Sequence, residues 1–319
     1  MGGRHWAVSA AGFMMVAQLN AGAQGPTFRT ATELVSLNVS VIGGNAKPVI
    51  GLAPDQFEIF EDGVAQAVKF FAPGNLPLDV VVLLDTSASM ASSLGLVRNA
   101  AIRFTNALRN DDRETVMGIS NGLRILQPFT TDKEALTGAI KSVKAAGKTP
   151  LYSAIYTALR ELEKLRHDYT LPRRQAIVVL SDGHDTASGF GFDDLMEVVR
   201  RQSVPIYTIA PRPSHTIKAQ REAVFGESTH EQDFELRKLA TETGARAFFP
   251  VALHELTGVY DDIANELAHQ YSLAYQSTNP KLDGSFRHIA LRVTAPGVKW
   301  RTRSGYVAER ETTSGSDLR

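Results

Sequence analysis

The stretch Asp79-Val-Val-Val-Leu-Leu-Asp-Thr-Ser-Ala-Ser-Met90 sets the architecture of the chain. Its apolar run from Val80 to Leu84 has no polar alternation, which is typical of a central parallel strand buried on both faces. In an open α/β sheet, ligands bind at the carboxyl ends of the strands. Asp85, Ser87 and Ser89 follow this strand and offer oxygen ligands. Such ligands suit Mg²⁺, Mn²⁺ or Ca²⁺ rather than zinc. The alternative is a polar turn that caps the next helix.

The composition narrows the class of protein. The chain has 319 residues, with 34 Lys and Arg against 34 Asp and Glu, so no net charge points to nucleic acid or to an anionic membrane. It has no cysteine, which excludes disulfides, thiolate metal sites and a cysteine nucleophile. The length is sufficient for one large or two modest domains with a sizeable core.

The first residues have the pattern of a signal peptide. Arg4 precedes an apolar stretch from Trp6 to Leu19, and Ala21-Gly22-Ala23 follows as a small-residue cleavage site. We expect residues 1–23 to be removed and the mature chain, starting near Gln24, to be secreted or periplasmic. The alternative is an uncleaved anchor. No later apolar stretch approaches membrane length, so no stable membrane insertion is expected after cleavage.

The middle of the chain alternates strands with helices. The apolar runs Val80–Leu84, Ala176–Leu180 and Val204–Ala210 indicate buried strands, and helical stripes lie between them, such as the one from Leu151 to Leu162. The segments Val116–Ile119 and Leu123–Leu126 flank an Asn-Gly turn and predict a hairpin. The fold class is therefore α/β, with a doubly wound and mostly parallel sheet.

The flanks of this region have the period of two that half-buried strands show. Val35, Leu37, Val39 and Val41 alternate with polar residues, and the same pattern returns after Tyr271. We expect the two flanks to form one smaller β-sandwich into which the α/β domain is inserted. The predicted boundaries are 24–76 and 270–308 for the sandwich, 77–269 for the inserted domain, and 309–319 for a disordered tail.

Two further residues extend the candidate site. Thr149 precedes a helix, and Asp182 follows the strand that ends at Leu180, so both are expected at the same edge of the sheet as Asp85. Taken alone, Thr149 could be a helix cap and Asp182 a turn residue. Three oxygen-rich loops that converge on one edge favour a metal site instead.

The spacing of these residues resembles a von Willebrand factor type A domain, and the resemblance covers about residues 77–269. It rests on Asp-x-Ser-x-Ser at 85–89, on Gly147-Lys148-Thr149-Pro150-Leu151-Tyr152 and on Leu180-Ser181-Asp182-Gly183. The flanking runs 55–63 and 270–275 are similar to a bacterial subgroup often called VWFA-related. The resemblance implies that Asp85, Ser87, Ser89, Thr149 and Asp182 are the ligands of a metal-ion-dependent adhesion site that holds Mg²⁺, Mn²⁺ or Ca²⁺.

The family's function implies an exported binding module rather than an enzyme. In that family a Glu or Asp of a protein partner completes the metal coordination, and we assign no catalytic residue and no nucleic-acid partner. The alternative is a secreted metal-dependent hydrolase or phosphatase that uses the same crevice, with His184 as the nearest candidate base. A third possibility is a scaffold indifferent to metal. By resemblance, the last helix of the domain, about 254–269, moves when a partner binds.

A long connection, a Gly-x-Ser-x-Gly match and a run of basic residues are three further features of the sequence. The long connection Pro211–His230 is hypothesised to help select the partner, with a surface excursion as the alternative. Gly118-Ile119-Ser120-Asn121-Gly122 matches the Gly-x-Ser-x-Gly nucleophile elbow, but a strand follows it where that motif requires a helix. Lys299, Arg301 and Arg303 alternate on one strand, which we interpret as the solvated side of the sandwich.

Overall fold

The structure is a computed structural model that describes residues 34–45, 47–74, 76–165, 172–211 and 231–310. These residues belong to one compact unit, Thr32–Arg319. The predicted signal peptide lies outside the described residues, as do the predicted tail (apart from Glu309 and Arg310) and the Pro211–His230 connection (apart from Pro211).

The α/β region is built on a six-stranded sheet with the order β10-β9-β8-β5-β6-β7. All neighbours pair in parallel except β6 and β7, which form the antiparallel hairpin expected from the Asn-Gly turn. The strands are β5 (Leu78–Asp85), β6 (Arg113–Ile119), β7 (Leu123–Thr130), β8 (Arg174–Leu180), β9 (Ile206–Ile209) and β10 (Ala247–Phe248). The short edge strand β10 was not predicted from the sequence, because two residues show no periodicity.

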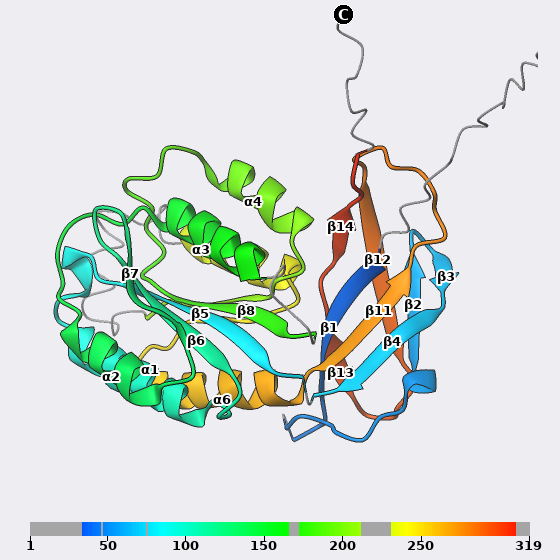
Figure 1. Ribbon diagram of the computed structural model, residues 1–319, viewed down its shortest axis with the longest axis horizontal. Helices are drawn as coiled ribbons and strands as arrows, with labels where there is room; N and C mark the ends of the chain where they lie inside the picture. Colours follow the sequence, from blue (N-terminus) through cyan, green and yellow to red (C-terminus); the bar gives the residue numbers. More distant parts are fainter. Residues whose placement is uncertain (1–33, 46, 75, 166–171, 212–230, 311–319) are drawn as a thin grey trace, which may run out of the picture. The chain divides into compact units, whose positions relative to one another are not determined.

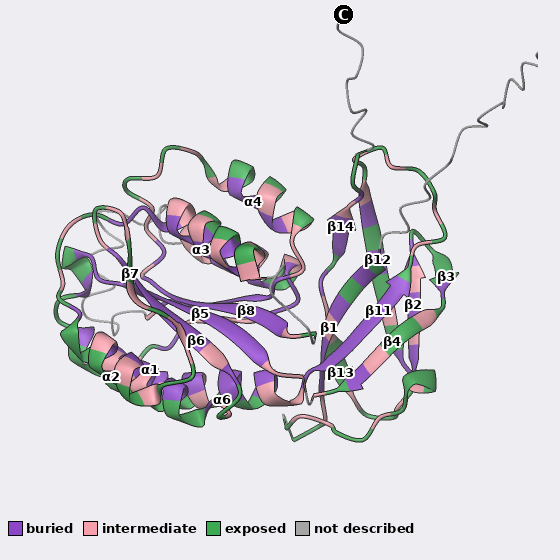
Figure 2. Ribbon diagram, in the orientation of Figure 1, coloured by how far each residue is buried: buried purple, intermediate pink, exposed green. Residues whose placement is uncertain are grey.

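Helices cover both faces of this sheet (Figure 1). The helices are α1 (Leu94–Ala107), α2 (Lys133–Ser142), α3 (Leu151–Leu165), α4 (Phe192–Arg201), a helix over residues 231–242, and α6 (Leu256–His269). The even-numbered apolar residues of β5 pack in one core with α1, α2 and α6, whereas Val81 and Leu83 pack in the other core with α3 and α4. Every residue of β5 is consequently buried (Figure 2). The prediction of a doubly wound, mostly parallel sheet is confirmed.

The flanks form two antiparallel sheets of four strands each, which pack as a β-sandwich. One sheet has the order β13-β1-β11-β4 and the other has the order β14-β12-β2-β3. The strands are β1 (Leu34–Ile42), β2 (Phe57–Glu61), β3 (Val64–Gln66), β4 (Val68–Pro73), β11 (Tyr271–Gln276), β12 (Phe286–Val293), β13 (Lys299–Arg301) and β14 (Gly305–Val307). Each sheet combines strands from before and after the α/β region, so the prediction that this region is inserted into a sandwich is confirmed.

The sandwich and the α/β region share a buried polar junction. Glu266, near the end of α6, accepts hydrogen bonds from Ser40 Oγ at 2.7 Å, Tyr207 OH at 2.8 Å and Arg301 Nη2 at 2.7 Å. Ser40 belongs to β1 and Arg301 to β13, so one carboxylate ties both strands to the last helix and to β9. The two parts of the chain are therefore held together by polar bonds as well as by apolar contact.

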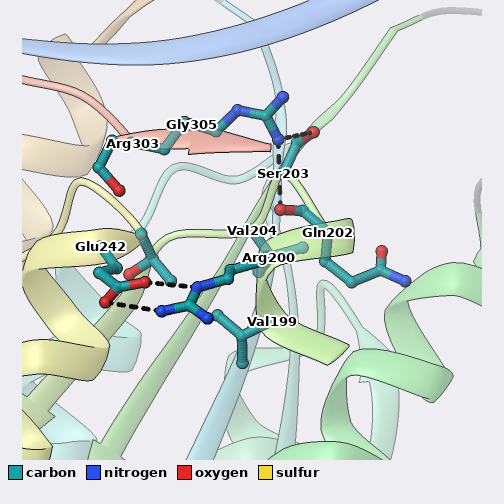
Figure 3. A pocket seen from close by; sticks show the side chains of 10 residues that line it. Val199, Arg200, Gln202, Ser203, Val204, Glu242, Arg303 and Gly305 are labelled. Atoms are coloured by element: carbon teal, nitrogen blue, oxygen red, sulfur yellow. Dashed lines mark hydrogen bonds and ion pairs between the residues drawn. The ribbon is translucent and has the colours of Figure 1, made fainter. Parts of the chain in front are cut away.

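The interpretation of Lys299, Arg301 and Arg303 as a solvated face was wrong for Arg303, which is buried, whereas Arg301 is partly exposed and pairs with Glu266. Arg303 is 8% exposed, and its Nη1 donates to Ser203 Oγ at 2.9 Å and to the carbonyl of Gln202 at 3.3 Å (Figure 3). The ion pair between Arg200 and Glu242 lies in the same pocket. Strand alternation shows which side chains share a face, but it does not show whether another part of the chain covers that face.

Candidate metal centre

Asp85 is the last residue of β5 and is fully buried. Its Oδ1 accepts a hydrogen bond from the backbone N–H of Ser87 at 2.8 Å, and its Oδ2 accepts one from Ser181 Oγ at 2.7 Å. Burial raises the pKa of the Asp85 carboxyl, and the nearby charge of Asp182 raises it further, although the hydrogen bonds from Ser181 and Ser87 oppose this shift. The folded chain therefore disfavours the negative charge of Asp85 when no cation is beside it.

The two serines that follow Asp85 lie against each other. Ser87 Oγ and Ser89 Oγ are 2.9 Å apart, with Ser87 buried and Ser89 exposed. Ser87 precedes the short 3₁₀ helix η2 (Ala88–Met90), which turns the chain sharply and brings residue 89 back toward residue 87. The hydroxyl pair thus lies directly after the buried carboxylate, at the carboxyl end of β5.

Thr149 is buried and is held by the loop that follows β8. Its backbone N–H donates to Thr186 Oγ1 at 2.9 Å, and its carbonyl accepts from the N–H of Thr186 at 2.9 Å. The residues just before it bond to the Asp85 loop, because Ala146 N–H donates to the Thr86 carbonyl and Ala88 N–H donates to the Gly147 carbonyl. The three oxygen-rich loops are consequently joined to one another through their backbones.

Asp182 is partly exposed, and its Oδ1 accepts from the backbone N–H of His184 at 3.2 Å. Its negative charge contributes to the raised pKa of Asp85. The structure therefore brings Asp85, Ser87 and Ser89 into one hydrogen-bonded group. The charge of Asp182 acts on Asp85, and Thr149 lies on a loop that is bonded to the same segment.

His184, the candidate base of the hydrolase alternative, and its neighbour Asp185 are engaged in structural contacts. His184 Nδ1 lies 2.7 Å from Gln232 Nε2. Asp185 caps the start of α3, because its Oδ2 accepts from the N–H of Tyr152 at 2.9 Å, and its Oδ1 accepts from the N–H of Ser188 at 2.9 Å. Asp185 is thus committed to holding the helix that begins just after Thr149.

Sequence reasoning missed the residues that support the predicted ligands. These are Ser181, which donates to Asp85, Thr186, which holds Thr149, and Asn121, which bonds the backbone of Lys148. Ser181 could have been found from the sequence, because it is a hydroxyl residue directly before Asp182. Nothing in the spacing connects residue 121 or residue 186 with the Thr149 loop, because they lie 27 and 37 residues away from their partners in that loop.

The donor set fits a hard divalent cation. It consists of two carboxylates and three hydroxyls, all oxygen, and one carboxylate is buried where its charge is disfavoured. Among the described residues, no three His, Cys, Asp or Glu side chains gather as a metal cluster. That finding is compatible with this site, since only two of its five candidate ligands are of those types.

Comparison with known proteins identifies the domain. Residues 80–184 match the von Willebrand factor type A domain family, so the chain contains a domain of this class. Such domains typically mediate protein–protein interaction or adhesion. Among curated relatives, a UPF0353 protein of Nocardia farcinica is 24% identical over 245 residues, covering 69% of this chain and 70% of the relative. Inter-alpha-trypsin inhibitor heavy chain H3 of Mus musculus is 22% identical over 224 residues, covering 65% of this chain but 24% of that protein.

The chain is also similar to solved structures. A von Willebrand factor type A protein from Catenulispora acidiphila is 12% identical, with a TM-score of 0.49 and coverage of 90% of this chain and 76% of that chain. The vWF domain of the type V pili tip protein Mfa5 from Porphyromonas gingivalis is 14% identical, with a TM-score of 0.44 and coverage of 59% of this chain and 94% of that chain. In the part of the chain described here, no helix is long and apolar enough to cross a membrane.

Proposed function

We propose that the chain is an exported interaction module that binds a partner protein through a divalent cation. Asp85, Ser87, Ser89, Thr149 and Asp182 would hold the cation, with Mg²⁺ preferred and Mn²⁺ or Ca²⁺ as substitutes. The observation that carries the proposal is the buried Asp85 carboxylate, whose charge is disfavoured, beside the serine pair. When bound, the cation supplies a positive centre that an Asp or Glu of the partner can complete.

The roles of the residues follow from their surroundings. Asp85, held by Ser181 and by the Ser87 backbone, is fixed in one orientation, so it needs no rearrangement to act as a ligand. Asp182 is more exposed to solvent than Asp85. Two carboxylates balance a divalent charge, and the hydroxyl ligands are neutral. The site therefore leaves the cation electrophilic enough to attract an outside carboxylate.

The engagement of His184 and Asp185 supports binding over the hydrolase alternative. A metal-dependent hydrolase needs a base beside the reacting water. The contacts of His184 with Gln232 and of Asp185 with the start of α3 use these side chains in other ways. Export is supported by the apolar run and small-residue cleavage pattern at residues 1–23, and fractionation of cells that express the full chain tests it directly.

Isothermal titration calorimetry of Mg²⁺ and Mn²⁺ into chelator-treated full-length protein tests the cation site. We expect saturable binding that Asp85→Ala removes and that Asp193→Ala, an exposed acidic residue of α4 outside the ligand set, leaves unchanged. Equal binding by wild type and Asp85→Ala would refute the assignment. A phosphate or carboxylate ester assay on the metal-loaded protein completes the test, because Mg²⁺-dependent turnover would favour the hydrolase.

A further inference from the structure

The loop that contains Thr149 also contains an exposed lysine whose backbone is fixed on both sides. Lys148 N–H donates to Asn121 Oδ1 at 2.9 Å, and the Lys148 carbonyl accepts from the backbone N–H of Asn121 at 2.9 Å. The side chain of Lys148 is exposed. The Cα atom of this residue is thus held in place beside Thr149, while its ammonium group remains in solvent.

The backbone conformation of Asn121 and its packing against Gly147 support this contact with Lys148. It lies in the turn between β6 and β7 with a φ of 50°, a left-handed conformation that Asn tolerates better than most residues. Gly147 packs against it so closely that an added Cβ would lie 2.5 Å from Asn121 Cγ. Gly147 itself has a φ of 81°, which a residue with a side chain rarely adopts. The turn and the loop therefore pack tightly together, and this packing fixes the position from which the Lys148 side chain extends.

The charge balance of the cation site bears on the role of Lys148. With a divalent cation bound, Asp85 and Asp182 make the centre neutral, and a partner carboxylate on the cation would make it negative. On the side of α3, Tyr152 lies among the charges of Glu235, Asp185 and Glu231, which repel further acidic groups. Lys148 directly precedes the candidate ligand Thr149 and carries a positive charge. An acidic segment is therefore favoured when a second carboxylate points toward Lys148.

We propose that Lys148, positioned by Asn121, is a second anion-binding contact, so that the partner presents two neighbouring acidic side chains. One would complete the cation and the other would pair with the lysine ammonium. This inference rests on the proposed function, because it assigns a partner preference to the same cation site. Asn121 acts as a positioning residue through the backbone of Lys148.

Two capped peptides test the inference with the Mn²⁺-loaded full-length protein. The probes are acetyl-Gly-Asp-Gly-Gly-amide and acetyl-Gly-Asp-Gly-Asp-amide, and bound Mn²⁺ broadens the proton resonances of a peptide that reaches it. We expect Lys148→Gln to weaken binding of the two-aspartate peptide by about two- to fivefold, as for an exposed ion pair, and to leave the one-aspartate peptide unchanged. Lys148→Arg should retain the preference, and salt at 0.5 M should abolish it.

Lys144→Gln is the matched control, because Lys144 is another exposed lysine shortly before the same loop. Asn121→Gly keeps the turn conformation and the N–H donor but removes the Oδ1 acceptor, and we expect it to reduce the preference without changing Mg²⁺ affinity. If Lys148→Gln leaves both peptides unchanged, or weakens both equally, the inference is overturned while the cation site stands. If neither peptide binds wild type in a metal-dependent way, the proposed function falls and the inference falls with it.

Discussion

Glu114 gives the sharpest test of the energetics, because it is a carboxyl group buried between helices and sheet. It lies in β6, is 1% exposed, and its Oε1 accepts from Thr105 Oγ1 at 3.0 Å. Burial raises the pKa of Glu114 from 4.5 to about 8, with the Thr105 hydrogen bond and the charge of Lys133 opposing the shift. The folded chain therefore retains a proton on Glu114 at neutral pH.

The sign of the stability effect follows from proton linkage. Between pH 4.5 and pH 8 the folded state binds the Glu114 proton and the unfolded state has released it, so the free energy of unfolding falls as pH rises. Each pH unit within this window contributes about 1.4 kcal/mol. From pH 5 to pH 8 the expected loss is about 3 kcal/mol, and above the folded pKa it levels off.

Urea unfolding of wild type and Glu114→Gln at pH 5, 6, 7, 8 and 9 measures this loss. Glutamine keeps an acceptor for Thr105 but cannot ionise, so the difference in unfolding free energy between the two proteins should change by about 3 kcal/mol across the window. Thr105→Val, which removes the opposing hydrogen bond, should extend the fall in stability to higher pH. Parallel pH profiles for wild type and Glu114→Gln would refute the reasoning.

Three further predictions concern the site and the junction. Since burial raises the pKa of Asp85, calorimetric Mg²⁺ affinity should fall as pH is lowered, with proton release on binding; an affinity that does not change with pH would contradict this. Asp185→Ala removes the cap of α3 and should lower the unfolding free energy by about 1 kcal/mol in urea titrations. Asp194→Ala, at the start of α4, is the control, and an equal loss there would show that the effect is not specific to the site. Glu266→Ala leaves Arg301 without its buried carboxylate and should cost about 3 kcal/mol or more, and a loss no greater than that for Glu58→Ala at the exposed pair with Arg292 would show that the junction contributes little.

Much of the candidate site could be predicted because its residues come at the ends of strongly patterned strands. A run such as Val80–Leu84 can only be buried on both faces, and the polar residues after it must then lie at the carboxyl edge of the sheet. The same logic placed Asp182 after β8. The supporting contacts could not be predicted, because Asn121 and Thr186 reach the Thr149 loop from turns whose spacing has no fixed relation to it.

The sequence by itself determined the two kinds of periodicity, and hence a doubly wound sheet inserted into a sandwich. Short strands such as β10 and β14 have too few residues for a pattern. Only the tertiary structure decided that Arg301 and Arg303 bond to the α/β region, and that the backbone of Lys148 is fixed by the β6–β7 turn. The physical reason is that periodicity reports the faces of one element, whereas the burial and charge of a side chain depend on what a distant segment places beside it.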